Sequence, residues 1–374
     1  MQIGKGTQRS ENSSRTCTSY PYLWDFAIGP NALYSRIDGI IESFEVTRAQ
    51  LNFRTYKNHN NYNATVHVTS TGQMVGYILF DEKKGVLEFS NFKASLTRSA
   101  LNLGGTSKRN KSAQAGTHGE GFKVAALVMA RQGYQVRYES SSFYWTFVLG
   151  GKDGKQLYCN LSPIAESRLI RLKKQSTDKT AQSRWRGLTA NCWEDVSVQV
   201  GRVHGPKWGK KLEVDQVMNF LKVSIDLHPP SNIIHIPGSG NLILDPAFKG
   251  KIFLKGLLIS ESHSSLKFGY DFSDGRVNRD RERISNSKEE ATTFGNIWRE
   301  AIKQDPSILS RYVQMFEEES MKSWSDIRHA QEYVKEATAK AIWQYYLEEG
   351  EGKFYYNQNR EGGGDVSCIG CLLS

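Results

Sequence analysis

The stretch that decides the fold reads Gly104-Gly-Thr-Ser-Lys108 and, one polar loop later, Gly116-Thr-His-Gly119-Glu-Gly121-Phe-Lys123. Glycine lets the backbone approach a ligand closely and adopt positive φ angles. Apolar residues at helical spacing flank the stretch, over Leu96–Leu103 before it and Phe122–Arg131 after it. The start of the second helix would offer unpaired N–H groups and a partial positive charge to an anion. We therefore predict a loop that cradles a polyphosphate, with a hydroxyl and two cations supplied by Ser107, Lys108 and Lys123.

The glycines alone are weak evidence, because 33 of the 374 residues are glycine. The alternative interpretation of these glycines is a flexible loop in front of a buried helix. The stretch is not a Walker A loop, since GxxxxGK[ST] does not occur there. With the upstream Gly-Thr-Ser-Lys included, it resembles the lid of the GHKL ATPases, the superfamily of gyrase, heat-shock chaperone, histidine kinase and MutL ATPases. The closer likeness is to the chaperone and MORC branches. The resemblance implies that ATP is bound by Gly104, Gly105, Thr106, Ser107, Lys108, Gly116, His118, Gly119, Glu120, Gly121, Phe122 and Lys123.

The family's first motif lies on an early helix, with Glu, Asn, Asp and Ala at relative positions 0, 4, 7 and 8. In this chain Asn31–Arg48 has a helical pattern, and the same offsets hold Asp38, Glu42, Glu45 and Val46. The resemblance makes Asp38 the general base that activates water, and it places Glu42 where the family has a magnesium-binding Asn. A carboxylate oxygen also ligates a hard cation, although it adds negative charge near the triphosphate. The alternative is that these acids form a solvated helix face.

The family's adenine-binding motif, DxGxG, is not intact in this chain. Asp81-Glu-Lys-Lys-Gly85 keeps the Asp and the last Gly, but the family places this Asp closer to the helix-ending glycine. That spacing points to Ser90 and Asn91, and an Asn oxygen can accept a hydrogen bond from the adenine amino group. We therefore favour Asn91 over Asp81 for the adenine contact. The Asp81 segment is then expected to be a hairpin turn between the strands Val75–Phe80 and Val86–Phe89.

A later element resembles the middle segment of the chaperone branch, where a strand with Lys-Gly or Arg-Gly precedes an Arg-Glu element. Lys251–Gly256 matches the strand, and Val277-Asn-Arg-Asp-Arg281-Glu282 matches the element. In the family that arginine reaches the γ-phosphate, which suits a guanidinium because it is always charged and binds phosphate oxygens in a fork. The resemblance therefore assigns this role to Arg281, with Lys255 as a second candidate. The alternative is a surface cluster of ion pairs.

The composition is that of a globular protein with a basic balance, since 39% of the residues are hydrophobic and the net charge is +10. No apolar run approaches the ~20 residues that span a bilayer, and the N-terminus lacks the apolar core of a secretory signal. The five cysteines show no zinc-like spacing, so we expect a reducing intracellular compartment, cytoplasmic or nuclear. The net positive charge favours an anionic partner such as nucleic acid. Two basic patches could bind it, Arg168–Lys174 and Lys207–Lys211. The alternative interpretation is that each patch is a solvated edge of a strand or loop.

The chain ends Cys368-Ile-Gly-Cys371-Leu-Leu-Ser374, which fits a CaaX prenylation box on Cys371. Cys368 would then be a palmitoylation site and supply the second anchor that stable membrane binding needs. Against this interpretation, no polybasic run precedes the box. The alternative is an accidental match or a misread end of a longer protein.

The pattern of elements predicts an α+β fold, and the resemblance independently implies a GHKL (Bergerat) sandwich, a mixed sheet with helices on one face. Segments rich in β-branched and aromatic residues predict strands at Thr65–Thr71, Val75–Phe80, Val86–Ser90, Tyr134–Tyr138, Phe143–Leu149, Leu157–Leu161 and Val196–Val200. Helices are expected at Asn31–Leu51, Leu96–Leu103 and Gly119–Ala130. The segment Lys174–Gln182 is expected to be a polar loop between strands.

The expected domains are a disordered tail (1–22), an ATP-binding domain (23–205), an S5-like transducer domain (206–288), a helical segment (289–349) and a second disordered tail (350–374). The linker is placed at Gly201–Lys211. Beyond it we expect a helix at Val214–Val223 and strands near Asn241–Leu244 and Lys251–Ser260. The helical segment is divided into Glu290–Lys303, Pro306–Glu319 and Trp324–Glu348.

The leading hypothesis is a GHKL-type protein that binds ATP and Mg²⁺, and hydrolyses ATP slowly while its lid and domains close. The altered first and second motifs leave open a nucleotide-binding scaffold without catalysis. The net charge leaves open a DNA-associated ATPase of the MORC or MutL type. A chaperone acting on a client protein is a further alternative. A homodimer is an expectation from the resemblance alone.

Overall fold

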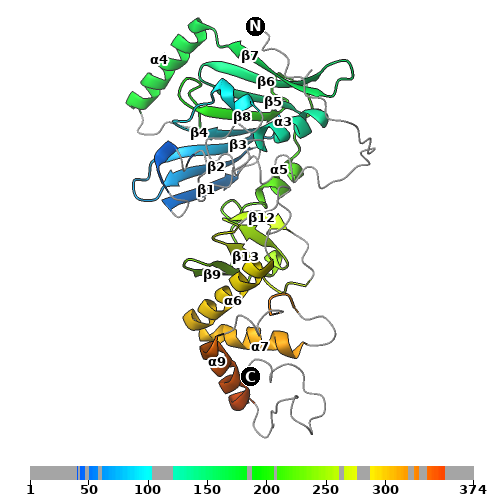
Figure 1. Cartoon of the computed structure of the whole chain (residues 1–374). Coiled ribbons are helices and arrows are strands. Elements are labelled where there is room, and N and C mark those ends of the chain that lie inside the picture. The colour runs from blue at the N-terminus through cyan, green and yellow to red at the C-terminus, as the bar shows by residue number, and fades with distance from the viewer. Residues whose placement is uncertain are drawn as a thin grey trace. The chain divides into compact units, whose positions relative to one another are not determined.

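The computed structural model describes residues 40, 43–46, 50–57, 61–102, 121–182, 188–205, 209–260, 265–275, 287–318, 324–327 and 335–349. The chain divides into two compact units, Met1–Val223 and Ser224–Ser374. Both are mixed α+β structures, each with one sheet and helices packed on it (Figure 1). The α+β fold class is therefore confirmed.

The first unit is built on an eight-stranded sheet with the order β1-β2-β3-β4-β8-β5-β6-β7. Every pairing between these described strands is antiparallel, so the expectation of a mixed sheet is wrong for this unit. The reason is that β8 lies between β4 and β5 and runs opposite to both. The strands are β1 (Leu51–Lys57), β2 (Asn61–Val68), β3 (Met74–Asp81), β4 (Val86–Asn91), β5 (Gln135–Ser140), β6 (Phe143–Gly150), β7 (Gln156–Pro163) and β8 (Val196–Gly201).

One face of this sheet is apolar and carries helices. Helix α3 (Gly121–Arg131) packs there through Phe122, whose ring lies edge-to-face against Tyr138 and Phe147 with centroids 5.9 and 6.4 Å apart. Helix α5 (Val214–Leu221) packs on the same face, where Phe220 meets Phe89 at 5.5 Å. Helix α5 thus belongs to the first unit, although the sequence places it in the second domain.

The early helix ends before its sequence pattern predicts. Ile40 is helical and joins Val66, Val68 and Val75 in a small core cluster. Glu45 has φ 51°, a left-handed value that cannot continue a helix. The chain then enters β1 at Leu51, so the expected helix Asn31–Leu51 is wrong at its C-terminal end, because LNFRTYK instead pairs with β2. Likewise only a short 3₁₀ helix, Arg98–Leu101, is described where Leu96–Leu103 was expected to be helical.

The basic stretch after β7 is a helix, α4 (Glu166–Gln182), and not a strand or loop edge with a polar excursion after it. Most of its described side chains are exposed, including Ile170 at 62%. It contacts the body of the unit on one side, where Arg168 lies over the Tyr144 ring at 5.6 Å and Lys173 over the Trp193 ring at 5.7 Å. Good intrinsic helix formers such as Leu, Arg, Lys and Gln explain a helix with so little buried surface.

The second unit has a five-stranded mixed sheet with the order β12-β11-β13-β10-β9, in which β11 and β13 run parallel. Helix α6 (Ser287–Gln304) packs on it, and the sheet shares one hydrophobic core with α6, α7 (Leu309–Glu317) and α9 (Glu336–Glu349). The helical segment expected at 289–349 therefore packs with this sheet. Residues 324–327 form a turn, which corrects the expected helix Trp324–Glu348. The strands are β9 (Ile233–Ile236), β10 (Gly240–Ile243), β11 (Ile252–Leu254), β12 (Leu257–Ser260) and β13 (Gly269–Phe272).

Candidate functional site

Asn91 is a polar residue at the end of β4 on the helix-bearing face of the first sheet. It is 3% exposed and lies opposite Gly76 of β3. A Cβ at Gly76 would lie 2.6 Å from the Ser90 carbonyl oxygen and 3.0 Å from Ile40 Cδ1. Glycine at this position therefore lets the early helical segment lie close to the sheet beside Asn91. The structure thus brings the favoured adenine contact and the segment of the first motif to one part of the sheet.

A buried carboxylate fixes the loop that follows Asn91. Asp195, which precedes β8, is 0% exposed; its Oδ1 accepts a hydrogen bond from Lys93 N at 3.0 Å and its Oδ2 from Asn191 N at 2.6 Å. Lys93 has φ 50°, a left-handed conformation that needs such support. Asp195 was not predicted from the sequence, because a single acid at a strand start is usually solvated. The position of Asn91 is thus set by β4 on one side and by a tethered loop on the other.

The glycine stretch runs directly into helix α3. This helix begins at Gly121, the last glycine of the predicted cradle, and Lys123 lies in its first turn. The ammonium of Lys123 donates to the carbonyl oxygen of Asn102. One side chain therefore connects the residues on either side of 103–120, so this long segment starts and ends at neighbouring points. Phe122, also predicted to contact the nucleotide, points its ring into the core instead, as described above.

Many residues of the predicted site lie outside the described part of the chain, and their roles stay predictions. The same applies to Lys207 and Trp208 of the second basic patch. The site residues concerned are Asp38, Glu42, Gly104, Gly105, Thr106, Ser107, Lys108, Gly116, His118, Gly119, Glu120, Arg281, Cys368 and Cys371.

Asp81 closes the β3–β4 hairpin, which confirms the predicted turn. Gly85 N donates to the Asp81 carbonyl oxygen at 2.8 Å, and Lys84 N donates to Asp81 Oδ1 at 3.0 Å. Gly85 has φ 64°, the left-handed value that a tight turn requires. Side chains alternate between the faces of a strand, so the register places Asp81 on the face opposite Asn91. The two adenine candidates therefore lie on different faces, and only Asn91 shares a face with α3.

In the second unit, Lys255 lies at the tip of the β11–β12 hairpin. Its backbone N donates to Phe272 O at 2.8 Å, and its Nζ lies 3.9 Å from Asp274 Oδ1. Because β11 and β13 are parallel neighbours, their C-terminal ends share one edge of the sheet. Lys255 therefore lies beside residues 273–275, from which the chain continues toward Arg281. The other predicted γ-phosphate contact, Arg281, is outside the described residues.

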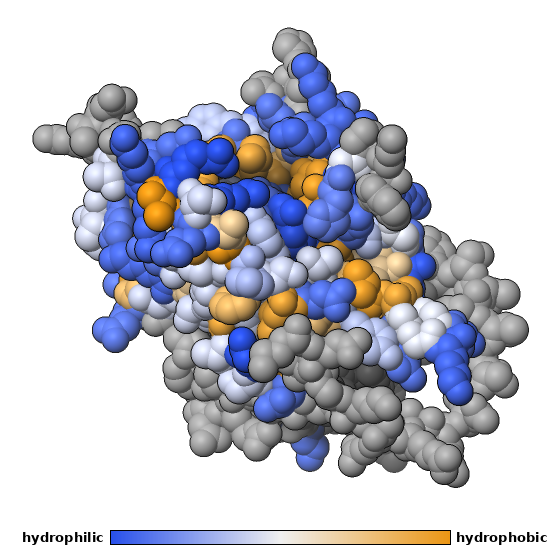
Figure 2. All heavy atoms as spheres, turned by 90° about the horizontal axis from the view of Figure 1, so that it is seen from above, coloured by the Kyte–Doolittle hydropathy of each residue, from blue (hydrophilic) through white to orange (hydrophobic). Residues whose placement is uncertain are grey.

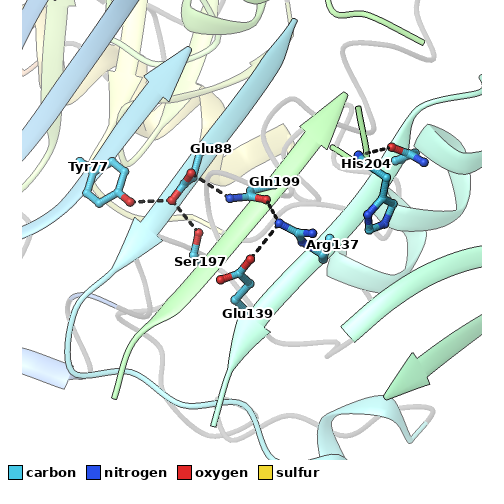
Figure 3. A network of polar contacts seen from close by, with 8 residues as sticks. Tyr77, Glu88, Arg137, Glu139, Ser197, Gln199 and His204 are labelled. Carbon is cyan, nitrogen blue, oxygen red and sulfur yellow. Dashed lines mark hydrogen bonds and ion pairs between the residues drawn. The ribbon is translucent and has the colours of Figure 1, made fainter. Parts of the chain in front are cut away.

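The face of the first sheet opposite α3 and α5 carries a polar network that was not predicted from the sequence (Figure 3). Glu88 of β4 is its centre and accepts hydrogen bonds from Tyr77 OH at 2.6 Å, Ser197 Oγ at 2.9 Å and Gln199 Nε2 at 3.0 Å. Burial, together with the Glu88 carboxylate, raises the pKa of Tyr77 well above its usual value. The tyrosine therefore remains a hydrogen-bond donor at any physiological pH.

The network continues from β8 to β5. Arg137 Nη2 donates to Gln199 Oε1 at 2.6 Å and lies 2.9 Å from Glu139 Oε1. Burial raises the pKa of Glu139, although the Arg137 charge opposes this. The backbone N of His204 donates to Gln135 Oε1 at 2.8 Å, and burial, with the Arg137 charge, lowers the pKa of the His204 imidazole. Since these acids already have donors, the network connects strands and offers little to a substrate.

In the described residues no three His, Cys, Asp or Glu side chains gather as a metal site would require. No helix in the described ranges is both long and apolar enough to span a membrane. No protein-family model matches the chain, and no curated protein matches it. Its function must therefore be inferred from the arrangement of its own residues.

Proposed function

We propose that the chain is an ATP-binding protein of the GHKL type, a slow Mg²⁺-dependent ATPase that couples nucleotide binding to closure of the segment 103–120. The observation that carries this proposal is the base of that segment. Its glycines lead into the first turn of α3, and Lys123 connects this turn to Asn102. The N-terminus of a helix attracts phosphate through its unpaired N–H groups and its dipole, so the start of α3 is suited to a polyphosphate.

Asn91 supports the choice of a purine nucleotide. It is a buried amide on an apolar face, beside the close approach that Gly76 permits. Its side chain can accept a hydrogen bond from the adenine amino group. Asn91 would therefore hold the adenine base of ATP.

The remaining roles follow from the resemblance. Asp38 would orient or activate the attacking water as general base. Glu42 would bind Mg²⁺, a hard cation that takes oxygen ligands and neutralises phosphate charge when it is bound. Arg281, with Lys255 as the second candidate, would contact the γ-phosphate and favour domain closure on ATP over ADP.

Binding of a non-hydrolysable ATP analogue, measured by calorimetry with and without Mg²⁺, tests this function. We expect binding that Mg²⁺ strengthens and that Asn91→Leu abolishes. Asn63→Leu is the matched control, since Asn63 lies on the opposite face of the same sheet. Absence of binding to the parent protein would refute the proposal. The Asp38→Asn variant distinguishes an ATPase from a nucleotide-binding scaffold. In an ATPase this substitution should lower the rate of ATP hydrolysis, whereas a scaffold has no such rate to lose.

A second candidate, DNA association of the nucleotide-binding protein, is favoured by helix α4. It has five basic and two acidic residues. Arg171 and Lys174 are exposed, and hydrophilic side chains cover much of the face shown in Figure 2, with apolar ones between them. Duplex DNA binding should weaken with salt, and Arg171→Glu with Lys174→Glu should reduce the slope of log K against log salt by about 2. Lys152→Glu with Lys155→Glu, in the exposed β6–β7 turn, is the matched control.

A further inference from the structure

Strand β7 lies at one edge of the first sheet and, among the described strands, pairs with β6 alone (Figure 1). A hydrogen bond just beyond the strand fixes the direction of its backbone groups, since Ile164 N donates to Ser142 O at 2.9 Å. Hydrogen-bonded pairs alternate along antiparallel strands. Every second residue of β7 therefore directs its N–H and C=O groups away from β6, toward the outer edge of the sheet. The residues with this orientation are Leu157, Cys159 and Leu161.

The sequence of β7 leaves this edge without the usual protection. Natural proteins protect sheet edges with charged residues, prolines or bulges. The strand QLYCNLSP has no charged residue, its one proline is Pro163 at the end, and its register with β6 is continuous. The other edge strand of the sheet, β1, contains Arg54 and Lys57. The edge at β7 is therefore the one suited to the addition of another strand.

Apolar side chains border this edge on both faces of the sheet. The three residues with outward backbone groups are half-buried on the face that carries α3. On the opposite face Tyr158 is 44% exposed and its cross-strand neighbour Val148 is 37% exposed. The Tyr158 hydroxyl donates to Gln156 Oε1 at 2.9 Å, and its ring lies where a Cβ at Gly150 would be 3.0 Å away. An added strand would thus find an apolar neighbour on each face.

The charges at the two ends of β7 indicate which kind of strand it would accept. The β6–β7 turn at one end has exposed Lys152 and Lys155, and α4 at the other end has five basic and two acidic residues. A second copy of the chain, paired antiparallel about Cys159 by a two-fold axis, would bring these basic ends together. A strand with acidic residues at its ends would meet opposite charge at both.

We propose that the outer edge of β7 binds an extended segment of a partner protein as an additional strand, and that this segment has alternating apolar residues and acidic ends. Backbone hydrogen bonds to the three outward residues would provide affinity, and Tyr158 with the flanking basic residues would provide specificity. This inference goes beyond the proposed nucleotide function and does not depend on it.

The probe is selected from a phage library of random peptides of about ten residues, the upper length of ordinary strands. Selection uses the full chain, and binding of each labelled peptide is then measured by fluorescence anisotropy. We expect the selected peptides to alternate apolar residues and to carry net negative charge. Hydrogen exchange over 156–163 should slow on binding, because the outward amides become bonded. A library that yields no binder, or only basic peptides, would overturn the inference.

Cys159→Pro removes one outward N–H group and leaves the bonds to β6 in place, since proline is tolerated where the N–H of an edge strand faces outward. It should weaken peptide binding at least about tenfold, the value of a lost hydrogen bond. Cys159→Thr keeps the N–H group and is the matched control that should bind as the parent does. Equal binding by the parent and Cys159→Pro would contradict strand addition.

N-methylated peptides test the same contact on the unaltered protein, so the result does not depend on the folding of a variant. Methylation of alternate amides, those that face β7, should abolish binding, and methylation of the others should not. Binding that tolerates both patterns would also refute strand addition. Lys152→Glu with Lys155→Glu should weaken the acidic peptides about threefold. A parent protein that sediments as a dimer, and as a monomer once Cys159 is replaced by proline, would show that a second copy takes this edge and would overturn the inference.

Discussion

Replacing Asp326 by asparagine is expected to remove a large pH dependence from the stability of the second unit. Asp326 is 4% exposed, accepts a hydrogen bond from the Tyr270 hydroxyl, and accepts another from Lys267 N at 2.8 Å. Trp298 Nε1 donates to the same tyrosine oxygen at 2.9 Å. Burial raises the pKa of Asp326 to about 6, and the hydrogen bonds offset only part of that effect.

The sign follows from linkage. A carboxyl group whose pKa is raised by folding binds its proton more tightly in the folded state, so its contribution is complete below the unfolded pKa of 3.8 and is lost as pH rises through about 6. Between pH 4.5 and 7.5 the free energy of unfolding should therefore fall by about 2 kcal/mol through this group. Asparagine is neutral throughout this range and keeps a hydrogen-bond acceptor. The free energy of unfolding of the Asp326→Asn variant should therefore not show this decrease between pH 4.5 and 7.5.

The assay is urea unfolding at several pH values, followed by tryptophan fluorescence, to which the buried Trp298 contributes. Asp245→Asn is the control, because hydrogen bonds from Ser231 lower the pKa of the Asp245 carboxyl. The contribution of Asp245 to the free energy of unfolding therefore has the opposite pH dependence: it is lost as pH falls through the pKa of the folded state. If the parent and Asp326→Asn proteins lose stability in parallel between pH 4.5 and 7.5, burial does not raise this pKa and the reasoning is refuted.

Three further changes test the first unit by urea unfolding. Gly76→Ala should destabilise it by about 1–3 kcal/mol, because the new methyl group would overlap the backbone oxygen of Ser90; unchanged stability would mean that the two strands separate easily. Asp195→Ala should cost about 2–4 kcal/mol, since two backbone N–H groups lose their acceptor, and a loss below 1 kcal/mol would show that water replaces it. Glu88→Gln should cost about 1–2 kcal/mol, because its amide would face the donor of Gln199, and a neutral result would indicate that this network rearranges.

The strands of the first sheet were predictable from sequence because their residues alternate or cluster in the way a half-buried sheet requires. Seven of its strands were placed within a few residues, and Asp81–Gly85 was identified as a turn. Strand β1 was missed because Leu51 and Val46 also fit a helical spacing, and only pairing with β2 decides between them. Helix α4 was missed because it has almost no apolar face, so its pattern resembles that of a polar loop.

The candidate site was only partly predictable. Spacing identified Lys123 and Asn91 as candidates, and the structure adds their surroundings, the carbonyl of Asn102 and the close approach at Gly76. Buried acids such as Asp195 and Asp271 were not found, because their importance depends on backbone N–H groups that lie near them only after folding. The same holds for the Glu88 network, whose members are distributed over β3, β4, β5 and β8.

The position of β8 has a consequence for how the first unit is made. This strand separates β4 from β5, yet it comes last of the three in the chain and follows the whole of α4. A nascent chain that ends before Val196 would therefore expose one unpaired edge on β4 and another on β5. Completion of the sheet must await a contact between residues more than one hundred positions apart, as in the pairing of Leu87 with Val200. Such non-local pairing slows folding, so truncation just upstream of β8 should yield an aggregation-prone product, whereas truncation after Val223 should not.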